Sequence, residues 1–501
     1  MTKKMNVVVV GGGVSGMTSA LILARFGHEV TLVERSPVLG MTIRGFFRQG
    51  VYFDTGFHYT GGLGEDGPLG RYLCFLGLSD LPVTAFEPDG FNTIRFIREG
   101  RDIRLSAGFD ATKDRLLSLF PGEDRVINDY FAEVRKVFLA SPFLNTATDV
   151  REVFAEESRY DTLAEFLAGR TNDPVLRATL SIHSLLHGTP PEEVSFLQHA
   201  RVVASCFRSA HTFAGGGRTL AEGFERRLGA EGVRIVRGSG VSRINFSPIG
   251  EDLGDAIAGV TLEDGSMLDA DTVVYTAHPF YLPDLVPQGK FKPSFSHRIH
   301  SLEGTPSAYM LFGISEQPLP PLEGSNLFLC PDTDISAFFK PGRDVSNGPF
   351  YVTTSPRGDA DAPGYGVTVV GPGDFSEYTP WENTLSGRRG SEYAAFKAKK
   401  LEQFRKALVA ASPEFSAVRF IDGATPLTFR DFIHSPAGSL YGCRHTLTQY
   451  SPQPMTSVPG LWLAGQSVLA PGVLGAVVSA FLTCGFMVGQ EALREELVAC
   501  G

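Results

Sequence analysis

The feature that most constrains this chain lies within its first 34 residues. A continuous apolar run, Val7 to Val10, is followed directly by the letters GGGVSG, then by a helical stretch and a second strand-like run that ends at Glu34. An uninterrupted run of β-branched residues is typical of a strand buried on both faces, as in a parallel sheet. The order of strand, glycine turn, helix and strand therefore predicts a βαβ unit at the start of the fold.

The glycine turn has the spacing of a dinucleotide site. Gly11, Gly13 and Gly16 form GxGxxG, in which glycines permit a tight turn, close approach of a pyrophosphate and close packing of the helix. Glu34 lies where a carboxylate would accept hydrogen bonds from a ribose, and its charge disfavours a 2'-phosphate. The motif predicts a site for NAD or FAD rather than NADP, and a turn whose glycines serve packing alone is the alternative.

A second glycine-rich turn lies near the C-terminus. Leu461 to Gly465 has the pattern of a short strand, a loop rich in glycine follows, and Ala476 to Leu493 is helical in composition. The stretch from Leu461 to Gly489 has no charged residue, but glycines and a proline break its first half, so we expect a strand, a turn and a buried helix rather than a membrane span. The turn would bind the far end of a long cofactor, or its glycines would only give the helix clearance.

Alternating blocks along the chain predict two interleaved domains in an α/β fold. Helical patterns dominate from about Leu69 to Arg208, whereas short strands return from about Val233 to Tyr275. Gly371-x-Gly373 follows a strand-like run but opens no apolar helix, so we interpret it as a turn. The predicted pieces of the nucleotide-binding domain are residues 1–68, 209–290 and 413–501, and those of an α+β substrate domain are 69–208 and 291–412.

Composition excludes several classes of function. The net charge of -10 opposes nucleic-acid binding, which needs a basic surface. Six cysteines without a CxxC pair indicate reduced thiols and a cytoplasmic protein, and the short polar start before Val7 predicts no signal peptide. The histidines lack the spacing of metal ligands, so we expect no metal site.

Several segments carry a family resemblance. They are VVVVGGGVSGMTSALILARFGHEVTLVERSPVLG, YFDTGFHYTGG, FAGGGRTLAEGFERRLGAEGVRIVRGSGVSRI, ATPLTFRDFIHSPAGSLYG and PGLWLAGQSVLAPGVLGA. Over essentially its whole length the chain resembles the FAD-dependent phytoene desaturase, carotenoid isomerase and retinol saturase family. The resemblance implies a Rossmann-like, glutathione-reductase-like FAD-binding domain assembled from discontinuous segments.

The resemblance also implies which residues bind FAD. It assigns Gly11, Gly13, Gly16 and Glu34 to the adenosine diphosphate part, Val241 to the adenine, and Gly465, Gln466, Leu474 and Gly475 to the ribityl and isoalloxazine end. The neighbouring Val14, Ser15, Arg35, Gly40 and Met41 complete the implied set. This chain has Gly40 and Met41 where many relatives have paired glycines, and Gln466 where many desaturases have an acidic residue.

A flavin exchanges a hydride with carbon through its N5 atom, so saturation, desaturation and isomerisation of a double bond share one site. Saturation also needs a proton donor. The titratable residues nearest the two flavin segments, and hence the candidate catalytic residues, are His58, Tyr59, Tyr441 and His445. The alternative for each is an ordinary hydrogen bond to a backbone carbonyl.

The predicted function is that of an FAD-dependent oxidoreductase acting on carbon-carbon double bonds of a hydrophobic isoprenoid or polyene substrate. Its electron partner would be a quinone, oxygen or a separate reductase. Peripheral contact with a membrane would suit such a substrate, but the acidic residues within Val126 to Leu144 favour a helix that faces its own core. The direction of reaction and the oligomeric state stay open. The alternatives are an amine-oxidase-like flavoenzyme and a flavin-free prenyl-lipid-binding protein of the GDP-dissociation-inhibitor type.

Overall fold

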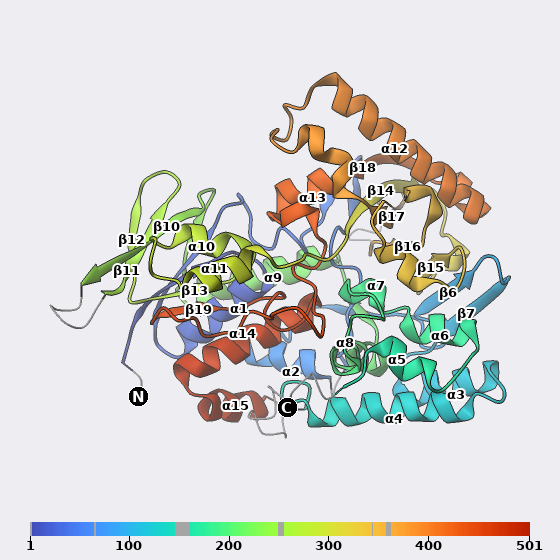
Figure 1. Ribbon diagram of the computed structural model, residues 1–501, viewed down its shortest axis with the longest axis horizontal. Coiled ribbons are helices and arrows are strands. Elements are labelled where there is room, and N and C mark those ends of the chain that lie inside the picture. The colour runs from blue at the N-terminus through green and yellow to red at the C-terminus, as the bar shows by residue number, and fades with distance from the viewer. Residues whose placement is uncertain are drawn as a thin grey trace.

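Two sheets and a helical block make up the molecule (Figure 1). A computed structural model describes residues 3–64, 67–145, 160–248, 255–342, 344–356 and 362–500. In Figure 1 a parallel sheet with its helices lies on the left, a larger mixed sheet lies at the upper right beneath α12, and helices α3 to α8 lie at the lower right. The chain thus has a mixed α/β fold.

The parallel sheet has five strands in the order β19-β13-β1-β2-β9. Their bounds are β1 Asn6–Val10, β2 Glu29–Glu34, β9 Arg234–Arg237, β13 Thr272–Tyr275 and β19 Leu461–Leu463. Val7 and Val9 join the core on one face of the sheet, and Val8 and Val10 join the core on the other. Burial on both faces explains why the run is apolar without alternation, and the predicted βαβ unit is confirmed.

Helices cover one face of the parallel sheet. They are α1 Val14–Arg25, α2 Pro68–Phe75, α9 Gly217–Ala230, α14 Gly472–Val488 and α15 Gln490–Val498. The predicted strand, turn and buried helix near the C-terminus are confirmed, but the single helix expected over Ala476 to Leu493 is wrong, because Gly489 at φ 101° separates α14 from α15. Among the described helices none combines the length and the apolar character that crossing a bilayer requires.

A small antiparallel sheet and two short helices cover the opposite face. Their bounds are β10 Val241–Pro248, β11 Asp255–Leu262, β12 Met267–Asp269, α10 Leu282–Leu285 and α11 Pro293–His300. Val241 and Ile244 of β10 share one core with Val8 and Val10 of the parallel sheet.

The larger sheet has seven strands in the order β18-β14-β17-β16-β15-β6-β7. Their bounds are β6 Asn92–Phe96, β7 Arg101–Leu105, β14 Ser307–Ser315, β15 Asn326–Cys330, β16 Phe350–Thr354, β17 Tyr365–Gly373 and β18 Arg419–Ala424. The helices α12, Gly390–Ala411, and α13, Pro426–Ile433, pack beside it. Since β18 pairs with β14, residues 419–433 lie with this sheet, whereas the sequence places 413–501 in the nucleotide-binding domain.

The turn predicted at Gly371-x-Gly373 is wrong, because both glycines lie inside β17 and pair with β14. A Cβ atom on Gly371 would lie 2.7 Å from the Phe404 ring of α12, and one on Gly373 would lie 2.7 Å from the Ala308 backbone. These glycines therefore serve close packing of the strand rather than a change of chain direction.

The helical block lies between residues 109 and 208. Its helices are α3 Phe109–Leu119, α4 Asp124–Ala140, α5 Leu163–Ala168, α6 Pro174–Ser181, α7 Ser184–His187 and α8 Phe196–Arg208. Val126, Tyr130 and Val134 of α4 are buried in the core of this block. The prediction that this helix faces its own core is confirmed.

Short elements link these parts. Two pairs of short antiparallel strands are β3 Phe46–Arg48 with β4 Val51–Phe53, and β5 Val83–Ala85 with β8 His211–Phe213. Single turns of 3-10 helix lie at Pro279–Tyr281, Pro320–Leu322, Ile335–Phe339, Val345–Asn347, Phe375–Trp381, Pro413–Ala417 and Pro436–Gly438.

A buried carboxyl group ties β4 to the start of α9. The Oδ1 atom of Asp54 accepts hydrogen bonds from the Tyr52 hydroxyl at 2.7 Å and from the Gly217 N–H at 2.9 Å. Its Oδ2 atom is buried and has no partner among the described residues. Burial raises the pKa of Asp54 from its ordinary value of 3.8 to about 7, although both hydrogen bonds oppose the rise.

The raised pKa of Asp54 predicts how stability changes with pH. Between about pH 4 and pH 7 the folded chain keeps this proton while the unfolded chain releases it, so the free energy of unfolding falls as pH rises through this window. The Asp54→Asn side chain cannot ionise. When the free energy of unfolding is measured with urea, we expect its decrease from pH 5 to pH 8 to be roughly 2 kcal/mol smaller in Asp54→Asn than in the parent. Asp80→Asn, at an exposed position, is the control, and equal losses for the parent and Asp54→Asn would contradict the prediction.

Candidate functional site

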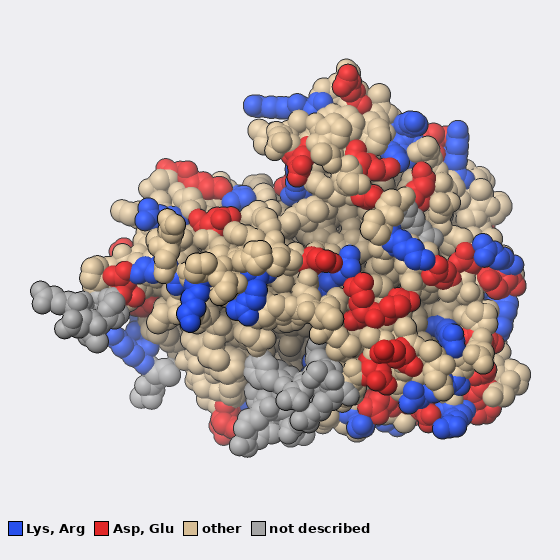
Figure 2. Space-filling view, viewed as in Figure 1, with Lys and Arg blue, Asp and Glu red and all other residues tan. Residues whose placement is uncertain are grey.

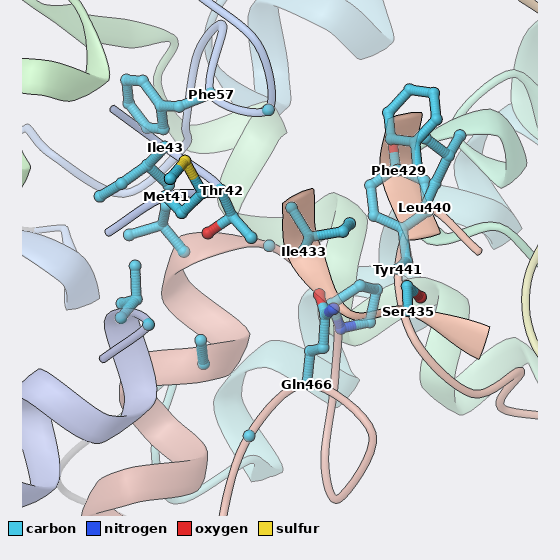
Figure 3. Close-up of a pocket in the computed structure, with 18 of the residues that line it drawn as sticks. Met41, Thr42, Ile43, Phe57, Phe429, Ile433, Ser435, Leu440, Tyr441 and Gln466 are labelled. Atoms are coloured by element: carbon cyan, nitrogen blue, oxygen red, sulfur yellow. The ribbon is translucent and has the colours of Figure 1, made fainter. Parts of the chain in front are cut away.

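A cavity of about 1130 Å³ lies between the two sheets. Val10, Val33 and Tyr275, at the carboxyl ends of parallel strands, line one side of it, while Met310, Phe312 and Val370 of the seven-stranded sheet line the other. Figure 3 shows Met41, Ile43 and Phe57 on one side of the cavity, and Phe429 and Leu440 across from them. The carboxyl edge of a parallel sheet is where α/β proteins bind ligands.

The first glycine turn is shaped to receive a phosphate group. A Cβ atom on Gly16 would overlap the carbonyl oxygen of Gly11, so the turn closes only with glycine there. Gly13 lines the cavity, and a Cβ atom on it would meet no atom within 4 Å. The Ser15 hydroxyl in the first turn of α1 is buried and has no partner in the described part of the chain. This hydroxyl and the free N–H groups of a helix N-terminus suit an anionic acceptor.

Glu34 is held in a fixed position beside this turn. Its carboxylate accepts hydrogen bonds from the Gly12 N–H at 2.6 Å and from the Ser36 N–H at 2.7 Å. Each carboxylate oxygen keeps a lone pair for a further donor, and Glu34 lines the cavity. The arrangement suits a pair of ribose hydroxyls. Arg35 follows it and pairs with Glu263 at 2.8 Å.

The second glycine turn faces the same cavity. Gly465 follows β19 at φ 126°, and its N–H donates to the Ser479 hydroxyl of α14 at 2.9 Å. A Cβ atom on Gly475 would overlap the carbonyl oxygen of Ala470, so the loop packs tightly against the start of α14. The two glycine turns together give the cavity two helix N-termini, those of α1 and α14, as a long dinucleotide would need.

Most of the predicted cofactor-binding residues line this cavity. Those that do are Gly11, Gly13, Val14, Ser15, Glu34, Arg35, Met41, Val241, Gly465, Gln466, Leu474 and Gly475. Gly16 and Gly40 do not: Gly16 packs beneath Gly11, and the N–H of Gly40 donates to the Gly12 carbonyl at 2.8 Å. Both therefore shape the turn rather than the cavity wall.

Three of the four candidate catalytic residues lie on the cavity walls. His58, Tyr59 and Tyr441 line the cavity, whereas His445 lies behind the wall with its Nε2 atom 2.8 Å from the Gln466 carbonyl oxygen. Burial lowers the pKa of His58 to about 4, so this imidazole is neutral near pH 7. Burial raises the pKa of Tyr441 to about 12 and that of Tyr59 well above its ordinary value. Both phenols therefore keep their protons.

A chain of buried amides connects Tyr59 to a second phenol in the cavity wall. The side-chain N–H of Asn92 donates to the Tyr59 hydroxyl at 3.0 Å, and the Asn92 Oδ1 accepts from the Asn326 amide at 3.0 Å. The Asn326 Oδ1 in turn accepts from the Tyr351 hydroxyl at 2.9 Å and from Thr353 at 2.7 Å. All of these side chains are buried or half-buried.

The backbone sets the direction of this chain. The Asn326 Nδ2 donates to the Phe91 carbonyl at 3.2 Å, and a carbonyl only accepts, so the Asn326 amide has one orientation. It follows that the Tyr351 hydroxyl donates its hydrogen bond to the Asn326 Oδ1 atom. The Tyr59 oxygen instead accepts a hydrogen bond from Asn92, so its own proton is not donated to this chain. No described residue accepts that proton. Tyr59 is thus a hydrogen-bond donor with an unused proton on the cavity wall.

The sequence did not reveal Asn92, Asn326 or Tyr351 as site residues. Asn92 and Asn326 are directly paired across β6 and β15, which are parallel neighbours more than 200 residues apart in the chain. No motif surrounds any of the three, so only the pairing of these strands could have identified them. For metals, no group of three or more His, Cys, Asp or Glu side chains suited to an ion occurs within the described residues.

Comparisons with known proteins place this geometry in context. Residues 14–484 match the protein family described as flavin containing amine oxidoreductase. All-trans-retinol 13,14-reductase of Danio rerio is 24% identical, over 98% of this chain and 87% of that protein. Hydroxyneurosporene desaturase of Cereibacter sphaeroides is 25% identical, over 92% of each. The crystal structure of an oxidoreductase from Methanosarcina mazei has a TM-score of 0.66 at 18% identity, covering 95% of this chain and 99% of that one, which shows a shared fold.

Proposed function

Because the chain belongs to the family of flavin-containing amine oxidoreductases, we propose that it is an FAD-dependent oxidoreductase that reduces a carbon-carbon double bond of a polyene. FAD is its cofactor, and the resemblance to the phytoene desaturase, carotenoid isomerase and retinol saturase family is confirmed. The similarity to retinol reductases and carotenoid desaturases indicates chemistry at the double bonds of isoprenoid polyenes.

Different groups of residues that line the cavity suit the different parts of FAD. We assign the parallel sheet to a Rossmann-like, glutathione-reductase-like domain that holds the cofactor. The N-terminus of α1, with Gly13 and Ser15, would hold the pyrophosphate, and Glu34 would bind the ribose hydroxyls. Val241 would lie beside the adenine, and the loop from Gly465 to Gly475 would face the flavin ring.

The observation that favours reduction over desaturation is a proton donor on the cavity wall. When bound and reduced by an external electron donor, FAD would supply the hydride that reduction of a double bond requires. The neighbouring carbon would then take a proton, and the donor we propose is the hydroxyl of Tyr59, a residue that lines the cavity. The Asn92 N–H that already donates to this oxygen would stabilise the phenolate that remains. Burial lowers the pKa of His58 to about 4, so near pH 7 this residue has no imidazolium proton to donate.

The two alternatives fit this cavity less well. Arg389 and Lys397 line its wall, and their positive charges disfavour a cationic amine as substrate. A flavin-free lipid-binding protein would have no need of the two glycine turns, and the family to which this chain belongs contains flavin. The electron partner, whether quinone, oxygen or a reductase, stays a prediction, as does a cytoplasmic location with peripheral membrane contact.

Reoxidation of the flavin tests the proposed function. We expect the purified protein to show a flavin absorption band, to release FAD on heating, and, after anaerobic reduction with dithionite, to be reoxidised by all-trans-retinol or by β-carotene. The product should carry two additional hydrogen atoms by mass spectrometry. A protein whose oxidised flavin is reduced by cyclohexylamine or putrescine, and whose reduced flavin neither polyene reoxidises, would contradict the proposal and support the amine-oxidase alternative.

A further inference from the structure

The cavity wall formed by α12, α13 and β18 carries charged side chains. Arg389 precedes α12, Lys397 lies in its second turn, and Asp422 lies in β18, and all of them line the cavity. The wall between them is apolar and includes Phe312, Phe429, Phe432 and Ile433. In Figure 1, α12 lies at the top of the molecule and α14 lies near the bottom. Charged groups in an apolar wall need partners, because burial without one is costly.

Most of these charges are already paired within the protein. The Asp422 Oδ2 atom lies 2.9 Å from an Arg48 nitrogen, and its Oδ1 atom accepts the Gly423 N–H at 2.8 Å. Arg389 pairs with Asp431, lies over the Tyr393 ring, and donates to the Thr384 hydroxyl. The strong ion pairs of this wall therefore satisfy both carboxylates and the arginines.

Lys397 is the exception. Its Nζ atom lies 3.9 Å from the Asp422 Oδ1 atom, which is too far for a hydrogen bond, and no described residue accepts one from it. Its side chain is 29% exposed, so it is partly withdrawn from water. Burial lowers the pKa of Lys397, and Asp422 opposes that change. The ammonium group thus offers three donors to whatever occupies the cavity.

The local charge favours an anion. In and behind this wall four cations, Arg48, Lys397, Arg389 and Arg430, share the two carboxylates Asp422 and Asp431. Two positive charges are left over, so an anionic group beside Lys397 would be attracted both by its ammonium and by the surrounding field. An uncharged hydrocarbon end would instead cover the ammonium without giving it a partner.

We propose that Lys397 binds the carboxylate of an amphipathic polyene acid, whose apolar chain runs along the cavity toward the flavin end. This inference rests on the proposed function and narrows its substrate class. Figure 2 shows a notch between the lobe that carries α12 and α13 and the lobe that carries β10 to β12. Phe432 and Asp284, from the two sides of this notch, line the cavity and are exposed, so the polar end of such a substrate would lie near solvent.

Binding to the oxidised holoenzyme, without an electron donor, tests this inference. The probes are all-trans-retinoic acid and its methyl ester, which differ in the charge of one end, with dissociation constants measured by equilibrium dialysis. We expect the parent protein to prefer the acid. Lys397→Met should weaken binding of the acid about 10- to 100-fold, the usual effect of losing a charge-assisted hydrogen bond, and leave the ester within about threefold. Lys397→Arg should restore the preference for the acid.

The control is Lys399→Met, at an exposed position on the same helix, which should bind both probes like the parent. If the parent binds the ester as tightly as the acid, or if Lys397→Met weakens both equally, the inference is overturned while the proposed function stands, provided that polyenes still reoxidise the flavin. If neither probe binds and no polyene reoxidises the flavin, both the inference and the proposed function fail.

Discussion

Gly13→Leu is expected to yield a folded protein that has lost its FAD. Gly13 has φ -74° and ψ -179°, values that any residue adopts, and a Cβ atom at this position meets nothing within 4 Å. The leucine side chain therefore strains no part of the fold. It instead fills the cavity where the pyrophosphate would approach α1. We expect FAD affinity to fall at least about 100-fold, or about 2.7 kcal/mol.

The measurement is the ratio of flavin to protein absorbance after purification, followed by titration of the apoprotein with FAD. Gly229→Leu is the matched control, because Gly229 lies on the exposed side of α9 and also has no atom near its Cβ position. This control should retain its flavin. A Gly13→Leu protein that binds FAD like the parent would show that the cofactor does not use this turn, and circular dichroism would confirm that both variants are folded.

Tyr59→Phe is expected to slow reoxidation of the reduced flavin by a polyene about 100-fold, the lower end of what a general acid contributes. The substitution removes a phenolic proton that no described residue accepts, and it changes little of the volume or apolar character of the wall. Affinity for the polyene should stay within about threefold, so the loss should fall on the rate of the chemical step. Stopped-flow absorbance of the flavin, recorded anaerobically at saturating polyene, measures this rate.

Tyr351→Phe separates the loss of a proton donor from the loss of any hydroxyl. The Tyr351 proton is used in its bond to Asn326, and Thr353 also donates to that amide oxygen. This variant should therefore slow the reaction less than tenfold. Equal losses in Tyr59→Phe and Tyr351→Phe would mean that the wall acts only through its packing, and an unaffected rate in Tyr59→Phe would remove Tyr59 as the donor.

The two glycine turns of the cavity were predictable because their pattern is local in the sequence. Tight turns need glycine at fixed spacing, and the strand before and the helix after each turn have their own hydrophobic patterns. Gly11, Gly13 and Glu34 could therefore be assigned from one stretch of 34 residues. The same reasoning went wrong at Gly371 and Gly373, because glycines needed for close packing inside a strand look like the glycines of a turn.

The opposite wall of the cavity could not be predicted in this way, because it is formed by strands that pair across long distances in the sequence. β6 and β7 pair with each other within a stretch that is otherwise mainly helical, and β6 also pairs with the distant strand β15. This pairing brings Asn92 beside Asn326, and the packing of α12 brings Lys397 to the cavity. No sequence motif surrounds Asn92, Asn326 or Lys397, so their proposed roles could be inferred only from the folded structure.

The position of β19 at one edge of the parallel sheet also determines the stage of synthesis at which the cavity can be completed. Leu461 to Leu463 and the loop to Gly475 are translated after the other four strands of the parallel sheet, yet they pair with β13 and form one wall of the cavity. A nascent chain that has already made β1, α1 and β2 still lacks this wall. The cavity is thus completed only after β19 and this loop have been translated, and a chain that stops before Leu461 lacks one of its walls.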